Sequence, residues 1–556
     1  MKPFLLHRNT DFDWARPAPW NSSALTQDLD LATLLDTMAR NDPYLRDVAG
    51  RVILAGLHDP AAIGYRQQVL RDCLAHPSPV RQLYHLAADT VDGENKLHHW
   101  AFVHSPNSVL HRSVEILQFL LTRLRSLRGI ADSNAALFQS DGFVTFFGMI
   151  AEQLSDEYLG VLADHLQRLT FRSGVLISAH LGPGNHGTDY VLRTARYEPS
   201  RWKRFTDRYL TAAHSLVISD RDEAGSRALS ELEDRGINQV ANALAQSTDH
   251  VVAFFRALRA ELGFYVGCLN LSDALSQRHA PLCLPVPSRT DTADLAAEGL
   301  CDASLILRLN HPVVGNNLDA AGKSLVVITG ANQGGKSTFL RAIGLTLLMM
   351  QSGMFVTATH FRASVSTGLY THYKREEDTT MTSGKLDEEL SRMNDIVDHL
   401  RPGSTVLLNE SFAATNEREG SQIARQIVHA LTESGVRVLL VTHLYDLAQS
   451  LHTEHLDTAL FLRADRHGDG HRTFRIVPGA PLPTSHGADL YEKVFAPPEQ
   501  PTELVRNIEK SGYHPALTDD GLPLRISVAA EGEVASSDAM ASAKASSSLT
   551  AAPQHR

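Results

Sequence analysis

A glycine-rich segment near the middle of the chain has the spacing of a phosphate-binding loop. Glycines let backbone N–H groups turn toward a polyphosphate, and a helix that starts there adds its partial positive charge. Lys336 would reach the β- and γ-phosphates and Ser337 would hold Mg²⁺. The segment therefore predicts binding of ATP and Mg²⁺. It lies between an apolar run at 325–328 and a helix-like segment at 338–350, and its residues are Gly330, Ala331, Asn332, Gln333, Gly334, Gly335, Lys336, Ser337 and Thr338.

A second apolar run, 405–408, ends in Asn409 and Glu410. An ATPase of this kind needs such a strand, because its acidic end serves the Mg²⁺ shell and orients the attacking water. Asn409 stands where an aspartate usually sits. Its amide oxygen can accept a hydrogen bond from a metal-bound water but carries no charge, so we expect weaker Mg²⁺ binding and slower turnover. Glu410 is the predicted general base, which favours hydrolysis; the alternative is an ordinary strand followed by a polar turn.

A third apolar run, 436–442, ends at His443. In ATPases of the ABC class a histidine at this place contacts the γ-phosphate or the attacking water, so we predict a catalytic role for His443 beside Glu410 and Lys336. The alternative is a histidine that only ends a strand. Its position favours the catalytic role, because it follows the acidic strand by one helix and one further strand.

Ser383 and Gly384 precede a predicted helix at 386–400. In ABC-type ATPases a Ser-Gly pair at such a helix N-terminus caps the γ-phosphate of the partner subunit, where backbone N–H groups and the helix dipole favour an anion. This interpretation predicts a homodimer with composite ATP sites. The alternative is a solvated acidic loop with an ordinary helix cap.

The elements that must position these residues form an α/β pattern. From residue 303 onward, short apolar runs alternate with helices, and this alternation is typical of a sheet covered by helices. The predicted fold is therefore an α/β ABC-type P-loop ATPase domain that follows a mostly α-helical lever or core domain. The predicted strands are 325–329, 405–408, 436–442 and 459–462.

Helical periodicity dominates from about residue 29 to 300, notably at 109–129, 144–169 and 222–262. A β-like interruption at 174–180 precedes a turn, 182–187, that formally matches G-x-G-x-x-G. The segment after this turn is short and strand-like, so a hairpin loop is favoured over a dinucleotide site. The predicted domains are an N-terminal segment 1–28, a helical domain 29–300, the ATPase domain 301–512 and a disordered Ala/Ser-rich tail 524–556.

Composition places the 556-residue chain among ordinary soluble proteins. The first residues lack an apolar core long enough for a signal peptide, and no apolar run is long enough to span a bilayer, so we expect a cytoplasmic protein without membrane contact. The four cysteines form no C-x-x-C pair and are predicted to be reduced and mostly buried. A formal charge of −11 argues against a surface that is basic throughout, although a local groove could still bind nucleic acid.

The segment from Ile328 to Thr338 resembles the ITGxNxGGKST segment of the MutS family of DNA mismatch-repair ATPases, whose double glycine is specific to that family. The resemblance is strong from about 307 to 495 and weaker at 29–77. It implies a homodimer, helical levers that transmit the nucleotide state to a DNA-binding region, and repair-protein partners. Supporting matches are Asn310-His311-Pro312, Asn409-Glu410, Thr415-Asn416, Thr442-His443 and Ser485-His486-Gly487.

The sequence also departs from the family pattern. We find no mismatch-reading Phe-x-Glu element and no small nuclease domain, and Leu386 replaces a serine expected near the signature helix. These departures favour a MutS-like ATPase that senses DNA structures other than simple mismatches. The alternative is a nucleotide-gated dimeric scaffold with slow or no hydrolysis and no direct DNA binding; a metabolic kinase is disfavoured because no acceptor-pocket signature is present.

One stretch, 193–209, mixes arginines with aromatic residues and could contact DNA. Arginines suit phosphate contacts and aromatic rings suit base stacking. The alternative is a helix with an aromatic core face and solvated arginines.

Overall fold

The computed structural model describes residues 1–98, 105–171, 174–193, 217–219, 221–309, 311–375, 384–466 and 472–483. All of them belong to one compact unit, Met1–Leu490. The predicted disordered tail, 524–556, lies outside the described residues, and its disorder stays a prediction.

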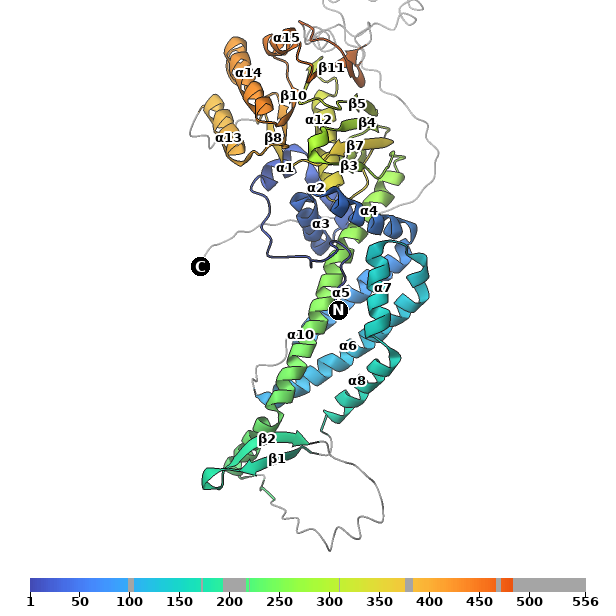
Figure 1. The fold of residues 1–556 in the computed structure, drawn as a ribbon, viewed down its shortest axis with the longest axis vertical. Helices are drawn as coiled ribbons and strands as arrows, with labels where there is room; N and C mark the ends of the chain where they lie inside the picture. Colours follow the sequence, from blue (N-terminus) through green and yellow to red (C-terminus); the bar gives the residue numbers. More distant parts are fainter. Residues whose placement is uncertain are drawn as a thin grey trace, which may run out of the picture. The chain divides into compact units, whose positions relative to one another are not determined.

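The helices and strands of the described residues are shown in Figure 1. In chain order the helices are α1 Ser22–Asp28, α2 Leu31–Ala39, α3 Pro43–Ala55, α4 Pro60–Ala75, α5 Pro77–His98, α6 Pro106–Asn134, α7 Asp141–Gln153, α8 Asp156–Arg168, α10 Glu223–Ser276, α11 Ala303–Arg308, α12 Lys336–Gln351, α13 Lys385–His399, α14 Glu417–Glu433 and α15 Tyr445–Thr453. The strands are β1 Leu176–Leu181, β2 Gly187–Arg193, β3 Val286–Ser288, β4 Leu295–Leu300, β5 Asn316–Asp319, β6 Leu325–Gly330, β7 His360–Ser364, β8 Leu369–Tyr373, β9 Thr405–Asn409, β10 Arg437–Val441, β11 Ala459–Arg466 and β12 Arg472–Pro478.

Helix α10 is the longest element, with 54 residues, and it extends beyond the predicted segment 222–262 to Ser276. Its N-terminus is capped by Asp222, whose side chain accepts a hydrogen bond from the Gly225 N–H. Helices α5 and α6 pack along it (Figure 1). The periodic segment 144–169 is two helices rather than one, because Ser155 caps the start of α8 directly after α7 ends.

The first residues of the chain are anchored in the interior beside α10. Glu261 is fully buried, and its Oε2 atom accepts hydrogen bonds from the Leu5 and Leu6 N–H groups. Desolvation raises the pKa of Glu261 to about 7, although these two N–H groups oppose the shift. Arg66 of α4 donates to the Leu6 carbonyl (3.2 Å) and to the Ser352 carbonyl (3.0 Å) just after α12. The N-terminal segment thus connects α10 and α4 to the end of α12.

Strands β1 and β2 form an isolated antiparallel hairpin, with Leu176 opposite Arg193 and Leu181 opposite Gly187. The G-x-G-x-x-G match at 182–187 is the turn of this hairpin. No helix of a βαβ unit follows it within the described residues, so the hairpin interpretation is confirmed.

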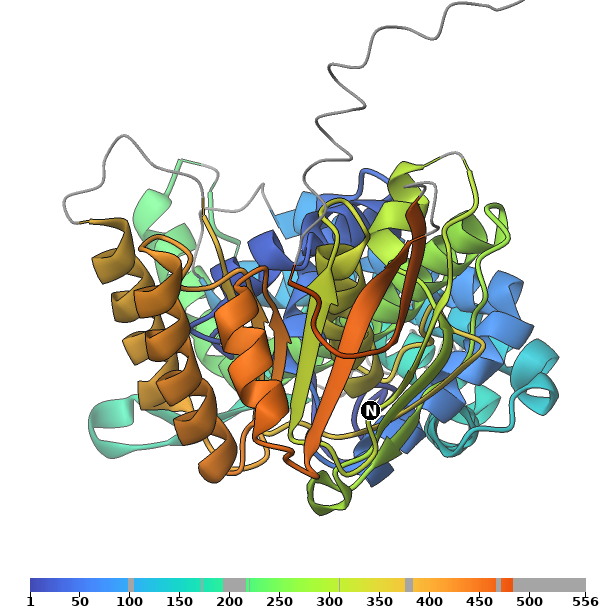
Figure 2. The ribbon, with the colours of Figure 1, turned by 90° about the horizontal axis from the view of Figure 1, so that it is seen from above.

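A six-stranded sheet has the order β12-β11-β6-β10-β9-β8, in which only β12 runs antiparallel to its neighbour. Its central strands are apolar on both faces, as expected for a parallel sheet covered on both sides. Val326 and Ile328 of β6 join the core that contains α12, whereas Leu325 and Val327 join the core formed with α13, α14 and α15. Figure 2 shows these last three helices, in gold and orange, together on one side of the strands. The four predicted strands are all present in this sheet.

A smaller sheet of order β3-β7-β4-β5 contains strands that the sequence did not reveal. Strands β3 and β4 precede the predicted domain boundary at residue 300, yet both pair with β7, which follows it. The boundary itself stays a prediction.

Two further predictions concern the cysteines and the absence of membrane-spanning helices. All four cysteines are free thiols, and Cys73, Cys268 and Cys301 are buried while Cys283 is half-buried, as predicted. None of the helices in the described part of the chain combines the length and the apolar character that crossing a bilayer requires.

Candidate active site

The predicted site residues come together because three parallel strands end at one edge of the large sheet. In the strand register, Val441 of β10 lies opposite both Ile328 of β6 and Asn409 of β9. The segments that follow these strands therefore start side by side. In open α/β sheets the crevice outside the carboxyl ends of the strands is where ligands bind.

The loop after β6 needs its glycines for steric reasons. Gly330 and Gly335 have φ values of +106° and +92°, a region that side chains disfavour. A Cβ atom at Gly334 would lie 2.7 Å from the Ala464 Cβ and 2.9 Å from the Ala331 carbonyl oxygen. Gly335 is the N-cap of α12, so the helix begins at Lys336 with unpaired N–H groups at its start. Unpaired N–H groups at a helix start are of the kind that binds anions.

Lys336 points back into this loop. Its Nζ donates to the carbonyl oxygens of Gly330 (2.9 Å) and Ala331 (3.1 Å), and the residue is only 5% exposed. Desolvation lowers the pKa of the Lys336 amine, and the negative charge of Glu410 partly opposes that shift. A buried ammonium group held only by neutral carbonyls is suited to receive an anion.

Ser337 and Asn409 are in direct contact. The Ser337 hydroxyl donates to the Asn409 Oδ1 atom at 2.9 Å. The contact brings a hydroxyl oxygen and an amide carbonyl oxygen together, and Mg²⁺ binds oxygen ligands of this type. The two residues therefore fit a magnesium ion, but neither supplies a negative charge.

Glu410 and His443 are neighbours, with Glu410 Oε2 3.9 Å from His443 Nδ1. Glu410 has a positive φ of +53°, and its N–H donates to the Val441 carbonyl at 2.9 Å. Left-handed backbone at a residue other than glycine costs about 1–3 kcal/mol and is typical of functional sites. Both side chains remain partly exposed, so they are accessible to a substrate or a water molecule.

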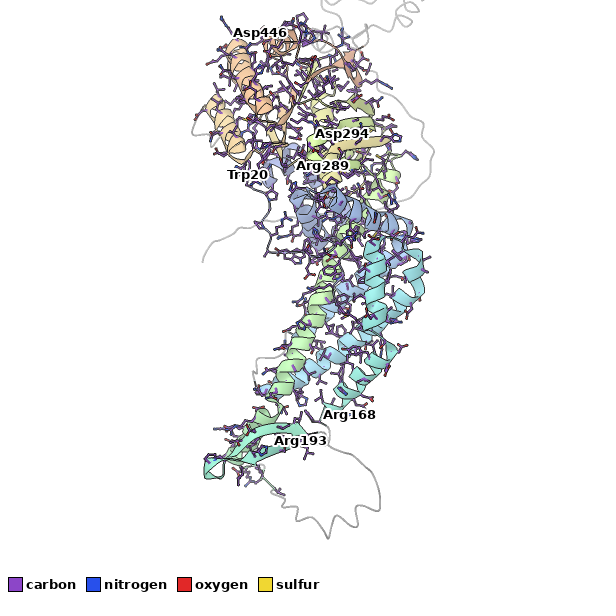
Figure 3. The ribbon with its side chains drawn as sticks, viewed as in Figure 1. Trp20, Arg168, Arg193, Arg289, Asp294 and Asp446 are labelled. Atoms are coloured by element: carbon purple, nitrogen blue, oxygen red, sulfur yellow. The ribbon has the colours of Figure 1, made fainter. Side chains whose placement is uncertain are left out.

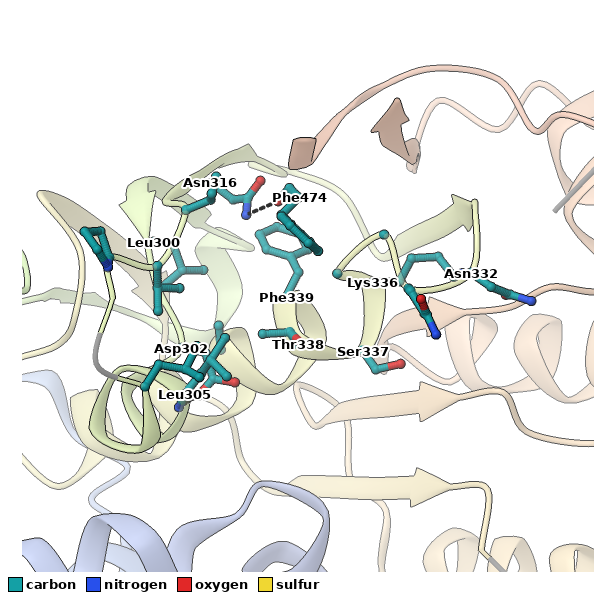
Figure 4. Close-up of a pocket in the computed structure, with 18 of the residues that line it drawn as sticks. Leu300, Asp302, Leu305, Asn316, Asn332, Lys336, Ser337, Thr338, Phe339 and Phe474 are labelled. Atoms are coloured by element: carbon teal, nitrogen blue, oxygen red, sulfur yellow. Dashed lines mark hydrogen bonds between the residues drawn. The ribbon is translucent and has the colours of Figure 1, made fainter. Parts of the chain in front are cut away.

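Lys336, Ser337 and Glu410 line a cavity of about 580 Å³, whereas Asn409 and His443 are not among its lining residues. The lining also includes apolar residues that the sequence did not reveal, among them Leu300, Leu305 and Phe474, together with the polar Asp302 and Asn316. In Figure 4, Leu300 and Leu305 approach from one side and Asn332 and Ser337 from the other, with Phe339 and Phe474 between them.

Phe474 on β12 is the functional candidate that sequence reasoning missed. It is 50% exposed and has a φ of +57°. Asn316 fixes this kink, because its Nδ2 donates to the Phe474 carbonyl (3.2 Å) and its Oδ1 accepts from the Ile476 N–H (2.7 Å). The available signal in the sequence was a single aromatic residue among polar neighbours, after the predicted strand 459–462.

The remaining predicted contacts are only partly described. Ser383 lies outside the described residues, whereas Gly384 is the N-cap of α13 and does not line the cavity. Its predicted contact with a partner's phosphate stays a prediction. Asn416 caps α14 by accepting a hydrogen bond from the Glu419 N–H. The motif residues Asn310 and 485–487 also lie outside the described residues.

The predicted DNA-contacting stretch, 193–209, is described only at Arg193. Figure 3 shows this residue on the β1–β2 hairpin and Arg168 at the end of α8. The Arg193 Nε donates to the Ser178 hydroxyl at 2.8 Å, so it is partly engaged within the hairpin. DNA contact by this stretch stays a prediction.

Two family models match the chain. The MutS2 N-terminal domain matches residues 58–278, which include α10 and the hairpin, and MutS domain V matches residues 326–509, which include the candidate site. The two matched regions correspond to the helical part and to the part with the six-stranded sheet.

Curated relatives point to the same family. The chain is 33% identical over 152 residues to a DNA mismatch repair protein MutS of Desulforamulus reducens, a match covering 25% of this chain and 18% of the relative. It is 25% identical over 345 residues to that of Shouchella clausii, covering 56% and 37%, and 30% identical over 198 residues to that of Chloroflexus aurantiacus, covering 34% and 20%. The matches thus span well under half the length of these relatives. On these matches and on the two family models, the chain belongs to the MutS family.

Proposed function

We propose that this protein is a MutS-like ATPase with an ABC-type P-loop domain, in which ATP binding and hydrolysis act as a conformational switch. One observation carries the proposal: Lys336, Ser337 and Glu410 line a single cavity at the carboxyl edge of a parallel sheet. An anion cradle, a pair of metal-binding oxygens and a carboxylate are the parts that phosphoryl transfer to water requires.

Each residue has a distinct task in this proposal. The loop N–H groups and Lys336 bind the phosphates, and Lys336 exchanges its two carbonyl partners for phosphate oxygens. Glu410 orients a water molecule and accepts its proton, while His443, whose Nδ1 is 3.9 Å from Glu410 Oε2, has the proposed task of contacting the same water or the γ-phosphate. Ser337 and Asn409 would hold Mg²⁺, which neutralises charge on the phosphate oxygens when it is bound.

Phe474 provides the proposed platform for the adenine ring. It is half-exposed, it lines the cavity together with Leu300, Leu305 and Phe339, and Asn316 holds its backbone. Replacing it by alanine is expected to raise the KM for ATP about 10-fold, because stacking of a base on an aromatic ring contributes roughly 1–3 kcal/mol. Steady-state kinetics measures this change. Phe474→Tyr should retain the KM, and Arg475→Ala, an exposed neighbour outside the cavity, is the matched control. An unchanged KM in Phe474→Ala would place the base elsewhere.

The uncharged Asn409 is proposed to limit Mg²⁺ affinity. Asn409→Asp is expected to lower the Mg²⁺ concentration for half-maximal turnover about 5-fold, because a charged acceptor makes hydrogen bonds roughly twice as strong as a neutral one. The measurement is a Mg²⁺ titration of the ATPase rate at saturating ATP. Asn238→Asp, exposed on α10, introduces the same charge far from the site and should change nothing. A higher Mg²⁺ requirement in Asn409→Asp would contradict this role.

The family relationship supports a role on DNA, because the relatives bear the name DNA mismatch repair protein. We propose that the dimer senses DNA structures other than simple mismatches and acts with repair-protein partners. Helix α10 suits a lever, because its contacts extend from helices α2 and α3 to the hairpin strands β1 and β2.

A second candidate function rests on Asn409. Without a carboxylate beside Ser337, ATP could close a dimeric scaffold that hydrolyses slowly or not at all and binds no DNA.

The test is ATP hydrolysis by the purified protein with and without branched, mismatched and perfect duplex DNA, with Lys336→Ala and Glu410→Ala as controls. We expect ATP turnover that both substitutions abolish and that one class of DNA alters. Binding of ATP without turnover, unaffected by any DNA, would instead support the scaffold. A gel-shift series across salt concentrations adds an independent check, because phosphate contacts give a steep salt dependence.

A further inference from the structure

A buried histidine lies between the segment that carries Glu410 and helix α13. His372 of β8 is fully buried. Its Nδ1 atom is 2.8 Å from the Ser411 hydroxyl, and its Nε2 atom is 2.9 Å from the Glu389 carbonyl oxygen. One side chain thus connects the residue directly after Glu410 to the backbone of α13.

The chemistry of the partners fixes the protonation of the ring. A carbonyl oxygen only accepts, so Nε2 carries a hydrogen and donates it to Glu389. Nδ1 is then an acceptor, and the single hydrogen of the Ser411 hydroxyl is shared between Nδ1 (2.8 Å) and the His372 carbonyl oxygen (2.7 Å). Burial and then the positive charge of Arg392 lower the pKa of His372 to about 4, so the ring is neutral at pH 7.

The backbone around Glu410 needs such support. Glu410 and Phe412 both have positive φ values, +53° and +62°, which are costly for residues with side chains. His372 contacts both residues after Glu410, because the Phe412 ring stacks on its imidazole with centroids 5.2 Å apart and an interplanar angle of 17°. Phe412 is 1% exposed, so this stack has no room to shift.

We propose that His372 is a positioning residue for Glu410, and that through Glu389 it makes the position of this carboxylate depend on helix α13. This role rests on the proposed ATPase function. Gly384 at the start of α13 is predicted to reach the ATP of a partner subunit, and Glu389 lies in the second turn of the same helix. A displacement of α13 on dimer closure would therefore move the His372 ring, Ser411 and Glu410 in turn.

Two substitutions interrupt this connection at different points. His372→Phe removes both hydrogen bonds of the ring but keeps a ring against Phe412, and Ser411→Ala removes the contacts of the hydroxyl to Nδ1 and to the His372 carbonyl oxygen. For each we expect kcat for ATP hydrolysis to fall on the order of 10-fold, because a small misplacement of a catalytic group is costly. The KM for ATP should stay within about 2-fold, because neither residue lines the cavity. The double variant should be no slower than the slower single variant, since both act through one connection.

The controls separate positioning from stability. His360→Phe places the same substitution at an exposed histidine on β7, where it should change neither constant. Ser411→Ala leaves His372 in place, so it tests the role even where His372→Phe fails to fold. Unchanged kcat in a folded Ser411→Ala variant, additive losses in the double variant, or a raised KM with normal kcat would each overturn the role of His372. Absence of turnover in the wild-type protein would overturn the proposed function and, with it, this role.

Discussion

Replacement of Glu410 by glutamine is expected to lower kcat for ATP hydrolysis at least about 100-fold, because positioned general bases contribute 10²- to 10⁴-fold to a rate. Glutamine keeps the shape of the side chain but cannot accept the proton of the attacking water. The substitution also removes the negative charge that lies 3.9 Å from His443 Nδ1. ATP affinity should be retained or increased, since the phosphate-binding loop and Lys336 are untouched.

Single-turnover hydrolysis together with equilibrium binding of ATP measures both effects. Glu433→Gln is the matched control, because this residue is exposed at the end of α14 and its replacement removes the same charge. Turnover that persists in Glu410→Gln would assign the water-activating role to another group, with His443 the first alternative. A simultaneous loss of ATP binding would indicate that Glu410 serves the phosphates rather than the water.

The residues of the candidate site were predictable because their signals are local. A phosphate-binding loop is encoded by glycines and a lysine within eight positions, and Gly330 and Gly335 do adopt positive φ values. Asn409, Glu410 and His443 follow short runs that are mostly apolar, with Arg437 as the charged exception, and parallel strands with both faces buried have that pattern. Since such strands end at one edge, the proximity of the segments could be inferred without long-range information.

The remaining features depend on contacts between distant segments. Strand β8, with His372, and the small sheet of β3, β7, β4 and β5 have short or mixed patterns, so their pairing could not be inferred from periodicity. Phe474 lines the cavity only because β12 pairs with β11 and Asn316 of β5 holds its kink.

The buried ionisable residues that hold the N-terminal segment, Glu261 of α10 and Arg66 of α4, were equally unpredictable from the sequence. Glu261 lies in a long helix where a charged residue usually faces solvent, yet it is fully buried because it pairs with the N–H groups of Leu5 and Leu6, about 255 positions away. Arg66 likewise satisfies carbonyl groups of Leu6 and Ser352. No local pattern distinguishes such residues from solvated ones.

Removal of the Lys336 ammonium group is expected to weaken ATP binding about 10- to 100-fold, because a hydrogen bond to a charged partner contributes roughly 1.5–3 kcal/mol. The substitution should cost the ATP-free protein little stability. Lys336 is buried without a hydrogen-bonded carboxylate, and desolvation already lowers the pKa of its amine. Removing that charge relieves a desolvation penalty, and only the neutral carbonyls of Gly330 and Ala331 lose a partner.

Thermal unfolding with and without ATP and Mg²⁺ distinguishes these two effects. The wild-type protein should show a Tm that rises with ATP concentration, because a ligand that binds only the folded state stabilises it. Lys336→Ala should unfold near the wild-type temperature without ATP but lose most of that rise. Lys96→Ala, at an exposed position on α5, should behave like wild type in both conditions. A full ATP-dependent rise in Lys336→Ala would contradict phosphate binding by this lysine, whereas a large loss of Tm without ATP would make Lys336 a structural residue of the loop.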